Sequence, residues 1–154
     1  MKEMGEVFFS LLTLNNLIYM NIGLLGGIVV GALPGLTATM AVALLVPMTY
    51  GLDAITGILM LLGVYCGGTY GGSITAILIN TPGTPAAAAT AWDGHILAKK
   101  GRAGEALEMA LVASVFGGLF STLVLLFVAP QIAKLALKFG PAEYFALAVF
   151  GLTI

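Results

Sequence analysis

The sequence reads Gly71-Gly72-Ser73-Ile74-Thr75-Ala76-Ile77-Leu78-Ile79-Asn80-Thr81-Pro82-Gly83-Thr84-Pro85 within a run, residues 54–92, that carries no charged side chain. Such a run predicts a membrane helix, yet this part of it holds hydroxyls, an amide, two prolines and three glycines. Polar side chains and unpaired backbone groups each cost several kcal/mol in hydrocarbon. We therefore expect the stretch to depart from a regular membrane helix.

The helix is expected to break at Pro82. Proline removes a backbone donor, and Gly83 permits a turn without a Cβ clash. Thr84 is a good N-cap for a new helix that has Pro85 at its first position, followed by four alanines. We interpret residues 54–92 as a discontinuous helix whose interruption carries function.

The composition is that of an integral membrane protein. Of 154 residues, 60% are hydrophobic and 8% are charged, whereas a soluble domain has about 25% charged residues. Mean hydropathy is +1.08. The net charge of −1 argues against nucleic-acid binding, which needs a basic face. The single cysteine, Cys66, excludes an internal disulfide and lacks a partner for a metal site.

We divide the chain into an interfacial lead-in, residues 1–16, and a transmembrane domain, residues 17–154. The last apolar run, residues 144–154, is too short for a hydrocarbon core that needs about 20 residues. The chain is therefore expected to be the N-terminal part of a longer protein.

A second break is expected at Pro34-Gly35. Residues 17–33 read as a helix with a glycine stripe of period four, and Thr37 can cap the next piece, residues 38–46. Residues 53–70 repeat the stripe, which lets two helix backbones approach closely. Matched breaks point to a transporter's binding site. We predict that the two breaks lie close together.

The rest of the chain is expected to be more conventional. We interpret residues 92–104 as a polar loop, with Asp93 fixing that loop and His95 solvated in it. Residues 105–129 are a regular membrane helix that ends at Pro130, and residues 131–139 are a separate interfacial helix. The predicted fold class is an all-α, polytopic helical bundle with discontinuous helices, forming one repeat half of a larger inverted-repeat transporter.

Two stretches carry a family resemblance: Gly31-Ala32-Leu33-Pro34-Gly35-Leu36-Thr37, and residues 71–83 with Asp93-Gly94 after them. They resemble the signature sequences of the large membrane subunit of tripartite tricarboxylate transporters, the TctA family. The resemblance implies a multi-pass permease of the bacterial inner membrane that works with a small membrane subunit and a periplasmic solute-binding protein. It also implies ion-coupled uptake of citrate or other carboxylates. Known members are longer, which agrees with the expectation of a partial chain.

The residues themselves give a reason why the breaks suit an anion. No Lys, Arg or His lies within residues 7–52 or 54–92, but helix N-termini each carry roughly +0.5 charge and unpaired N–H groups. Freed carbonyls could hold Na⁺ as the coupling cation. We expect the Asn80 amide to contact the substrate carboxylate or Na⁺. The candidate binding residues are Pro34, Gly35, Thr37, Thr39, Ser73, Thr75, Asn80, Thr81, Pro82, Gly83 and Thr84.

Two other classes of function stay open from the residues alone. A channel would use the broken helices as a selectivity constriction and would conduct without saturation. A purely structural membrane subunit would need the breaks only for assembly. We expect no enzyme and no bound cofactor or metal, because the apolar runs hold no nucleophile–base pair, histidine or acid.

Overall fold

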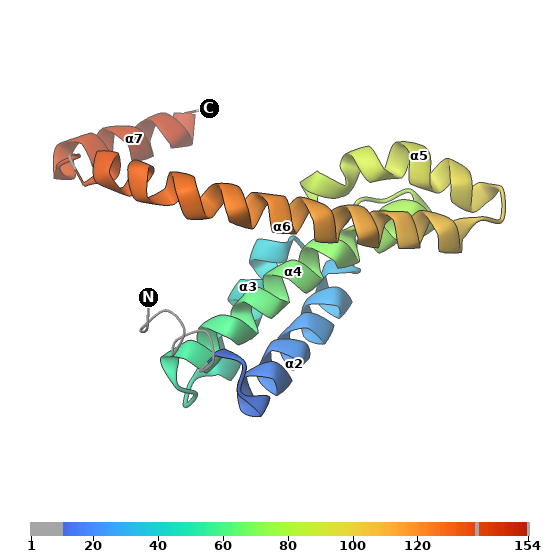
Figure 1. Ribbon diagram of the computed structural model, residues 1–154. Coiled ribbons are helices and arrows are strands. Elements are labelled where there is room, and N and C mark those ends of the chain that lie inside the picture. Colours follow the sequence, from blue (N-terminus) through green and yellow to red (C-terminus); the bar gives the residue numbers. More distant parts are fainter. Residues whose placement is uncertain (1–10, 138, 154) are drawn as a thin grey trace. The chain divides into compact units, whose positions relative to one another are not determined.

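The computed structural model describes residues 11–137 and 139–153. These residues form α2 (Leu14–Gly31), α3 (Ala38–Leu45), α4 (Ala54–Ile79), α5 (Ala88–Lys99), α6 (Ala103–Ala136) and α7 (Pro141–Thr153), with the 3₁₀ turns η1 (Val46–Thr49) and η2 (Pro85–Ala87) (Figure 1). Within that part of the chain there is no strand. Three helices, α2, α4 and most of α6, are long and apolar enough to cross a membrane. The all-α membrane fold is confirmed.

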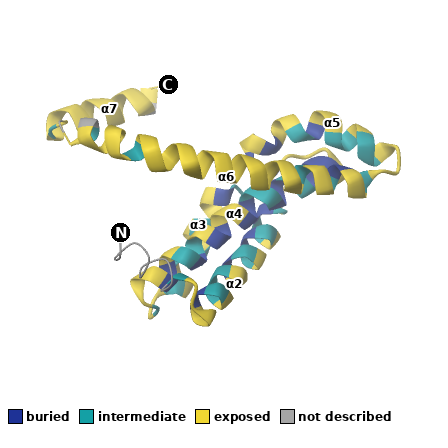
Figure 2. Cartoon of the chain, viewed as in Figure 1, coloured by how far each residue is buried: buried dark blue, intermediate teal, exposed yellow. Residues whose placement is uncertain are grey.

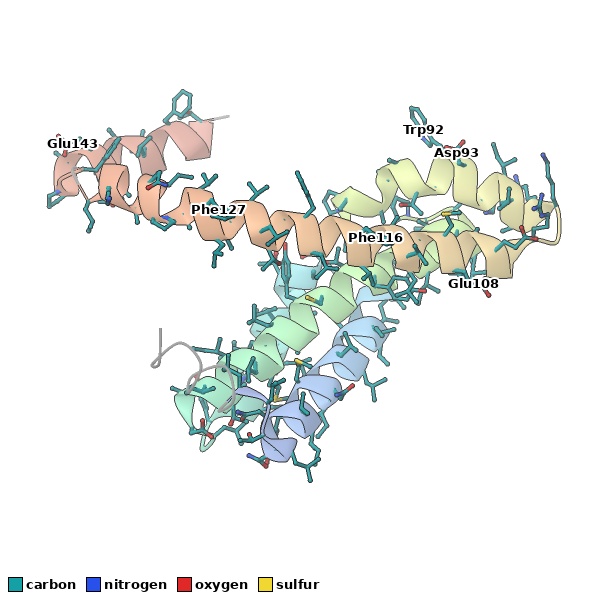
Figure 3. The ribbon with its side chains drawn as sticks, in the orientation of Figure 1. Trp92, Asp93, Glu108, Phe116, Phe127 and Glu143 are labelled. Atoms are coloured by element: carbon teal, nitrogen blue, oxygen red, sulfur yellow. The ribbon has the colours of Figure 1, made fainter. Side chains whose placement is uncertain are left out.

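The chain divides into two compact units, residues 1–112 and 113–154, with α6 running from the first into the second. The first unit contains both breaks. It begins, among the described residues, with the end of the lead-in, and residues 14–16 are the first residues of α2; residues 1–10 of the lead-in lie outside the described residues. The second unit exposes apolar side chains along α6, including Phe116 and Phe127 (Figure 3).

Helices α2 and α4 run parallel and touch backbone to backbone. A methyl group at Gly27 would lie 2.2 Å from the Val64 carbonyl oxygen, and one at Gly31 would lie 2.2 Å from the Gly68 carbonyl oxygen. The α4 glycines at 63, 67 and 71 approach α2 in the same way. Buried positions line this seam (Figure 2). Small residues at period four allow such an approach in membrane helices, so the expected packing role of the stripes is confirmed.

A polar network joins the same two helices where α4 begins. Asp53 caps α4, and its carboxylate accepts the Thr56 N–H at 3.1 Å and the Thr56 hydroxyl at 2.6 Å. The Thr56 hydroxyl oxygen also lies 2.5 Å from the amide oxygen of Asn16, a buried residue in the first turn of α2. Because a stripe of period four could pack in several registers, this contact helps to select one of them.

The first break is confirmed: α2 ends at Gly31 and α3 begins at Ala38. The connection turns at Gly35, whose φ of 91° suits glycine. The Thr37 hydroxyl accepts the Met40 N–H at 3.2 Å, as expected of an N-cap. Helix α3 then returns antiparallel to α4, because its Ala38 end packs on Gly68 while Thr49, after its far end, packs on Gly57.

The second break is also confirmed: α4 ends at Ile79 and helical structure resumes at Pro85. Asn80, with φ of 57°, turns the chain back, and the Gly83 N–H donates to the Gly72 carbonyl at 3.3 Å. A methyl group at Gly83 would lie 2.4 Å from the Gly31 carbonyl oxygen, at the end of α2. The two breaks therefore lie together, as predicted.

Residues 92–104 are not a polar loop; that prediction is wrong. Helix α5 extends to Lys99, and the chain turns only at Lys100–Arg102, where Gly101 has φ of 76°. Nothing between the alanines and Gly101 breaks a helix. Trp92 and Asp93 project outward from α5 (Figure 3). Asp93 is in mid-helix, so its predicted loop-fixing role is wrong. His95 is half-buried against α4 rather than solvated.

The predicted helix end at Pro130 is also wrong. Helix α6 continues through Pro130 to Ala136, so residues 131–136 belong to it rather than to a separate interfacial helix. Proline lacks one backbone donor, but membrane helices tolerate it where local groups compensate. The carbonyl that loses its backbone donor is that of Leu126, four residues before Pro130. The Gln131 side-chain amide adds a hydrogen bond to the neighbouring Phe127 carbonyl at 2.8 Å.

The glycine seam predicts the effect of one methyl group. Gly27→Ala should destabilise the fold by about 1–3 kcal/mol, because the methyl meets the Val64 backbone, which cannot rotate away. Gly26→Ala is the matched control, since its methyl meets only the Leu45 side chain at 3.4 Å. Thermal unfolding in detergent would compare the two. Equal thermal stability of the two variants would contradict close packing of the α2 and α4 backbones at Gly27.

The Asp53 cap predicts a pH dependence. The pKa of Asp53 lies below its ordinary value because the Thr56 hydroxyl, and then the Thr56 N–H, donate hydrogen bonds to its carboxylate. The stabilisation is therefore present above the ordinary pKa of about 3.9 and is lost as the pH falls through the folded-state pKa. Wild type should unfold at a higher temperature than Asp53→Ala at neutral pH, with the difference shrinking in acid. A difference that stays constant on acidification would contradict this role.

Candidate functional site

A cavity of about 230 Å³ lies between the two breaks in the first unit. Its walls come from the start of α3, from one face of α4, and from the restart of the chain after the second break. The lining residues are Thr37, Ala38, Thr39, Tyr65, Thr69, Thr84, Pro85 and Ala86.

Two helix N-termini face this cavity. The N–H groups of Ala38 and Thr39, the first two of α3, have no partner within the helix. After the second break, η2 continues directly into α5, and Pro85 occupies the first helical position, where a missing N–H costs least. Each N-terminus carries a partial positive charge. Together they make the cavity favourable for a negative group.

Thr84 is the most unusual side chain of the cavity. The residue is only 5% exposed, and its hydroxyl oxygen has no hydrogen-bond partner among the described residues. Contrary to expectation, the hydroxyl does not cap the helix that follows. Gly72 explains its position, because a methyl group there would lie 2.8 Å from the Thr84 hydroxyl oxygen. An unpaired buried hydroxyl costs about 1–3 kcal/mol, which makes Thr84 a candidate for contact with a bound group.

No charged side chain lines the cavity. Among the described residues, the lysines and arginine lie elsewhere, at Lys99, Lys100, Arg102 and Lys134. The site can therefore offer an anion hydroxyls, backbone N–H groups and helix ends, but no full positive charge.

The structure brings together three of the residues predicted from the sequence, Thr37, Thr39 and Thr84. Two others support them from behind: Gly83 packs against α2 and α4, and the buried Thr75 hydroxyl donates to the Gly72 carbonyl at 3.2 Å. The remaining predicted residues lie outside the cavity lining. Ser73 is half-buried on α4, and five are exposed, namely Pro34, Gly35, Asn80, Thr81 and Pro82.

Sequence reasoning missed Tyr65 and Thr69. Both line the cavity from α4, four residues apart and therefore on one face of the helix. The signal that could have found them is the second α4 stripe, Gly68 and Gly72, which packs on Ala38 and Thr84. Polar residues beside that stripe must lie near both helix starts.

Broken helices whose N-termini meet at one cavity, in an apolar helical protein, are typical of membrane transport proteins. The model of the "Tripartite tricarboxylate transporter TctA family" matches residues 17–154. The chain belongs to this family, as its two motifs indicated.

A curated relative agrees with this assignment. The chain is 48% identical over 147 residues to the "Uncharacterized 52.8 kDa protein in TAR-I ttuC' 3'region" of Agrobacterium vitis. The match covers 96% of this chain and 29% of the relative, so the chain spans under a third of that protein's length. No solved structure matches the chain at a significant level.

Asn80 allows a prediction that separates backbone from side-chain roles. Its left-handed φ of 57° is tolerated by Asn and Gly, but costs other residues about 1–2 kcal/mol. Asn80→Gly should therefore reach wild-type abundance in the membrane, and Asn80→Leu should fall below it. Uptake by Asn80→Gly in the complete transporter then tests the amide contact predicted from the sequence. Weaker apparent affinity for the substrate or for Na⁺ at normal abundance would support that contact, and wild-type affinity for both would contradict it.

Proposed function

We propose that this chain forms part of the permease of a tripartite transporter that takes up tricarboxylates, citrate among them, by coupling to a cation. The permease lies in the bacterial inner membrane, crosses it several times, and moves its substrate without catalysing a reaction. A small membrane subunit completes the membrane part, and a periplasmic solute-binding protein delivers the substrate.

The observation that carries this proposal is the unpaired, buried hydroxyl of Thr84, a residue that lines the cavity shared by two helix N-termini. A carboxylate oxygen would accept a hydrogen bond from that hydroxyl. The free N–H groups at the start of α3 would donate to the same anion, in the arrangement by which transporters bind anionic substrates.

The size of the cavity suggests how much of the substrate it holds. At about 230 Å³ it is smaller than the roughly 300–1,000 Å³ usual for ligand pockets. It would accept one carboxylate group with the adjoining carbon chain. The other carboxylates would then meet residues of the longer protein, in keeping with our expectation that this chain is one repeat half of an inverted-repeat transporter.

The coupling cation would bind on the other side of the second break. Asn80, Thr81 and Pro82 follow the C-terminal end of α4, and the carbonyl ends of half-helices coordinate cations in secondary transporters. We propose Na⁺ as this cation, held by freed carbonyls and the Asn80 amide oxygen. The anion and the cation would thus share one break without sharing ligands.

Thr84→Val tests the proposal in the complete transporter. Valine has the shape of threonine without its hydroxyl, so the fold should be as stable as wild type or more so, because an unpaired buried polar group is removed. Loss of one charge-assisted hydrogen bond, about 1.5–3 kcal/mol, should raise the apparent KM for citrate roughly 10- to 150-fold. Thr84→Ser, which keeps the hydroxyl, is the matched control.

The measurement is initial-rate uptake of radiolabelled citrate and a panel of other carboxylates, with and without a Na⁺ gradient, normalised to membrane abundance. If Thr84→Val keeps the wild-type KM for every transported carboxylate, the Thr84 hydroxyl does not bind the substrate. Uptake that neither saturates nor responds to an ion gradient would contradict coupled transport and indicate a channel.

A further inference from the structure

His95 forms a hydrogen bond between the two helical segments that flank the second break. Its Nδ1 lies 2.9 Å from the carbonyl oxygen of Ile77, a fully buried residue near the end of α4. A carbonyl oxygen can only accept, so Nδ1 carries the hydrogen. His95 lies on α5, beyond the break, and the bond therefore joins α5 directly to the backbone of α4.

The break itself creates the need for this bond. In a continuous helix the Ile77 carbonyl would accept the N–H of Thr81, four residues later. Here the turn at Asn80 redirects that N–H to the Thr75 carbonyl at 3.3 Å. The Ile77 carbonyl thus loses its backbone donor, and His95 replaces it.

The contact is one of several that hold α5 and the turn before it on α4. At the start of the segment, the Gly83 N–H donates to the Gly72 carbonyl at 3.3 Å, beside Thr84. His95 lies about 15 Å further on, given a rise of 1.5 Å per residue. Between them Ala87 and Ala91 pack on Ala76. The two hydrogen bonds and the alanine packing between them together define the direction of α5 on α4.

We propose that His95 is a positioning residue for the anion site. By holding the far end of α5 on α4, it keeps the start of that segment, and the buried Thr84 hydroxyl, in place at the wall of the cavity. The inference rests on the proposed function, because it concerns the affinity of that site. His95 itself does not line the cavity.

The test compares His95→Ala with His95→Asn in the complete transporter. Asparagine places an amide nitrogen close to the position of Nδ1 and can still donate to the Ile77 carbonyl, whereas alanine cannot. His95→Ala should raise the apparent KM for citrate, or for the carboxylate that the wild type transports best, roughly 3- to 10-fold. This is the effect of one ordinary hydrogen bond. His95→Asn should restore most of the affinity.

Gly94→Ala gives an independent variant at the same junction. A methyl group there would lie 2.7 Å from Cγ1 of the Ile77 side chain, so it should push α5 away from α4 and raise KM without altering His95. If His95→Ala does not accumulate, Gly94→Ala and His95→Asn carry the comparison. Asp93→Asn, an exposed neighbour on the same helix, is the control expected to match wild type.

The outcomes separate this inference from the function on which it rests. A raised KM in His95→Ala and Gly94→Ala, with recovery in His95→Asn, supports it. Wild-type KM in His95→Ala and Gly94→Ala, together with impaired Thr84→Val, would overturn the role of His95 alone. Wild-type KM in Thr84→Val would overturn the anion site itself.

Discussion

The close approach of the α2 and α4 backbones is the constraint on which the first unit depends. Wherever α2 glycines meet α4, a single methyl group would fall within about 2.2 Å of a carbonyl oxygen, as at Gly27 and Gly31. Because the helices run parallel, the end of α2 at Gly31 lies against Gly68 of α4, short of the end of α4 at Ile79. The second break reaches the first because the chain folds back after Asn80 and places Gly83 against Gly72 and the Gly31 carbonyl.

The helix N-termini at the breaks supply the positive potential that the side chains of the cavity lack. The cavity has no lysine, arginine or histidine in its lining, and a full charge at membrane depth would be costly to bury. Helix N-termini and hydroxyls provide a weaker positive field without that cost. The same interruption frees carbonyls at the end of α4, so one break offers donors on one side and acceptors on the other. The proposed transport of an anion coupled to a cation would use both kinds of group.

The sequence predicted the features that follow from local chemistry. Period-four glycines, Pro-Gly pairs and a capping threonine each act over a few residues, and the seam, both breaks and the Thr37 cap were found where they were expected. The prediction failed where the outcome depends on tertiary contacts. Thr84 reaches the cavity wall only because the fold-back packs it on Gly72, and Tyr65 lines the same cavity because Ala38 packs on Gly68, three residues further along α4. Helix α5 was missed because its polar composition resembles a loop. The continuation through Pro130 was missed because membrane helices tolerate a proline that would end a soluble helix.

The most direct measurement is a structure of the complete transporter with its substrate bound. Our account predicts a substrate carboxylate within hydrogen-bond distance of the Thr84 hydroxyl, with the first N–H groups of α3 directed at the same anion. Substrate bound elsewhere, with the Thr84 hydroxyl still unpaired beside an empty cavity, would contradict it.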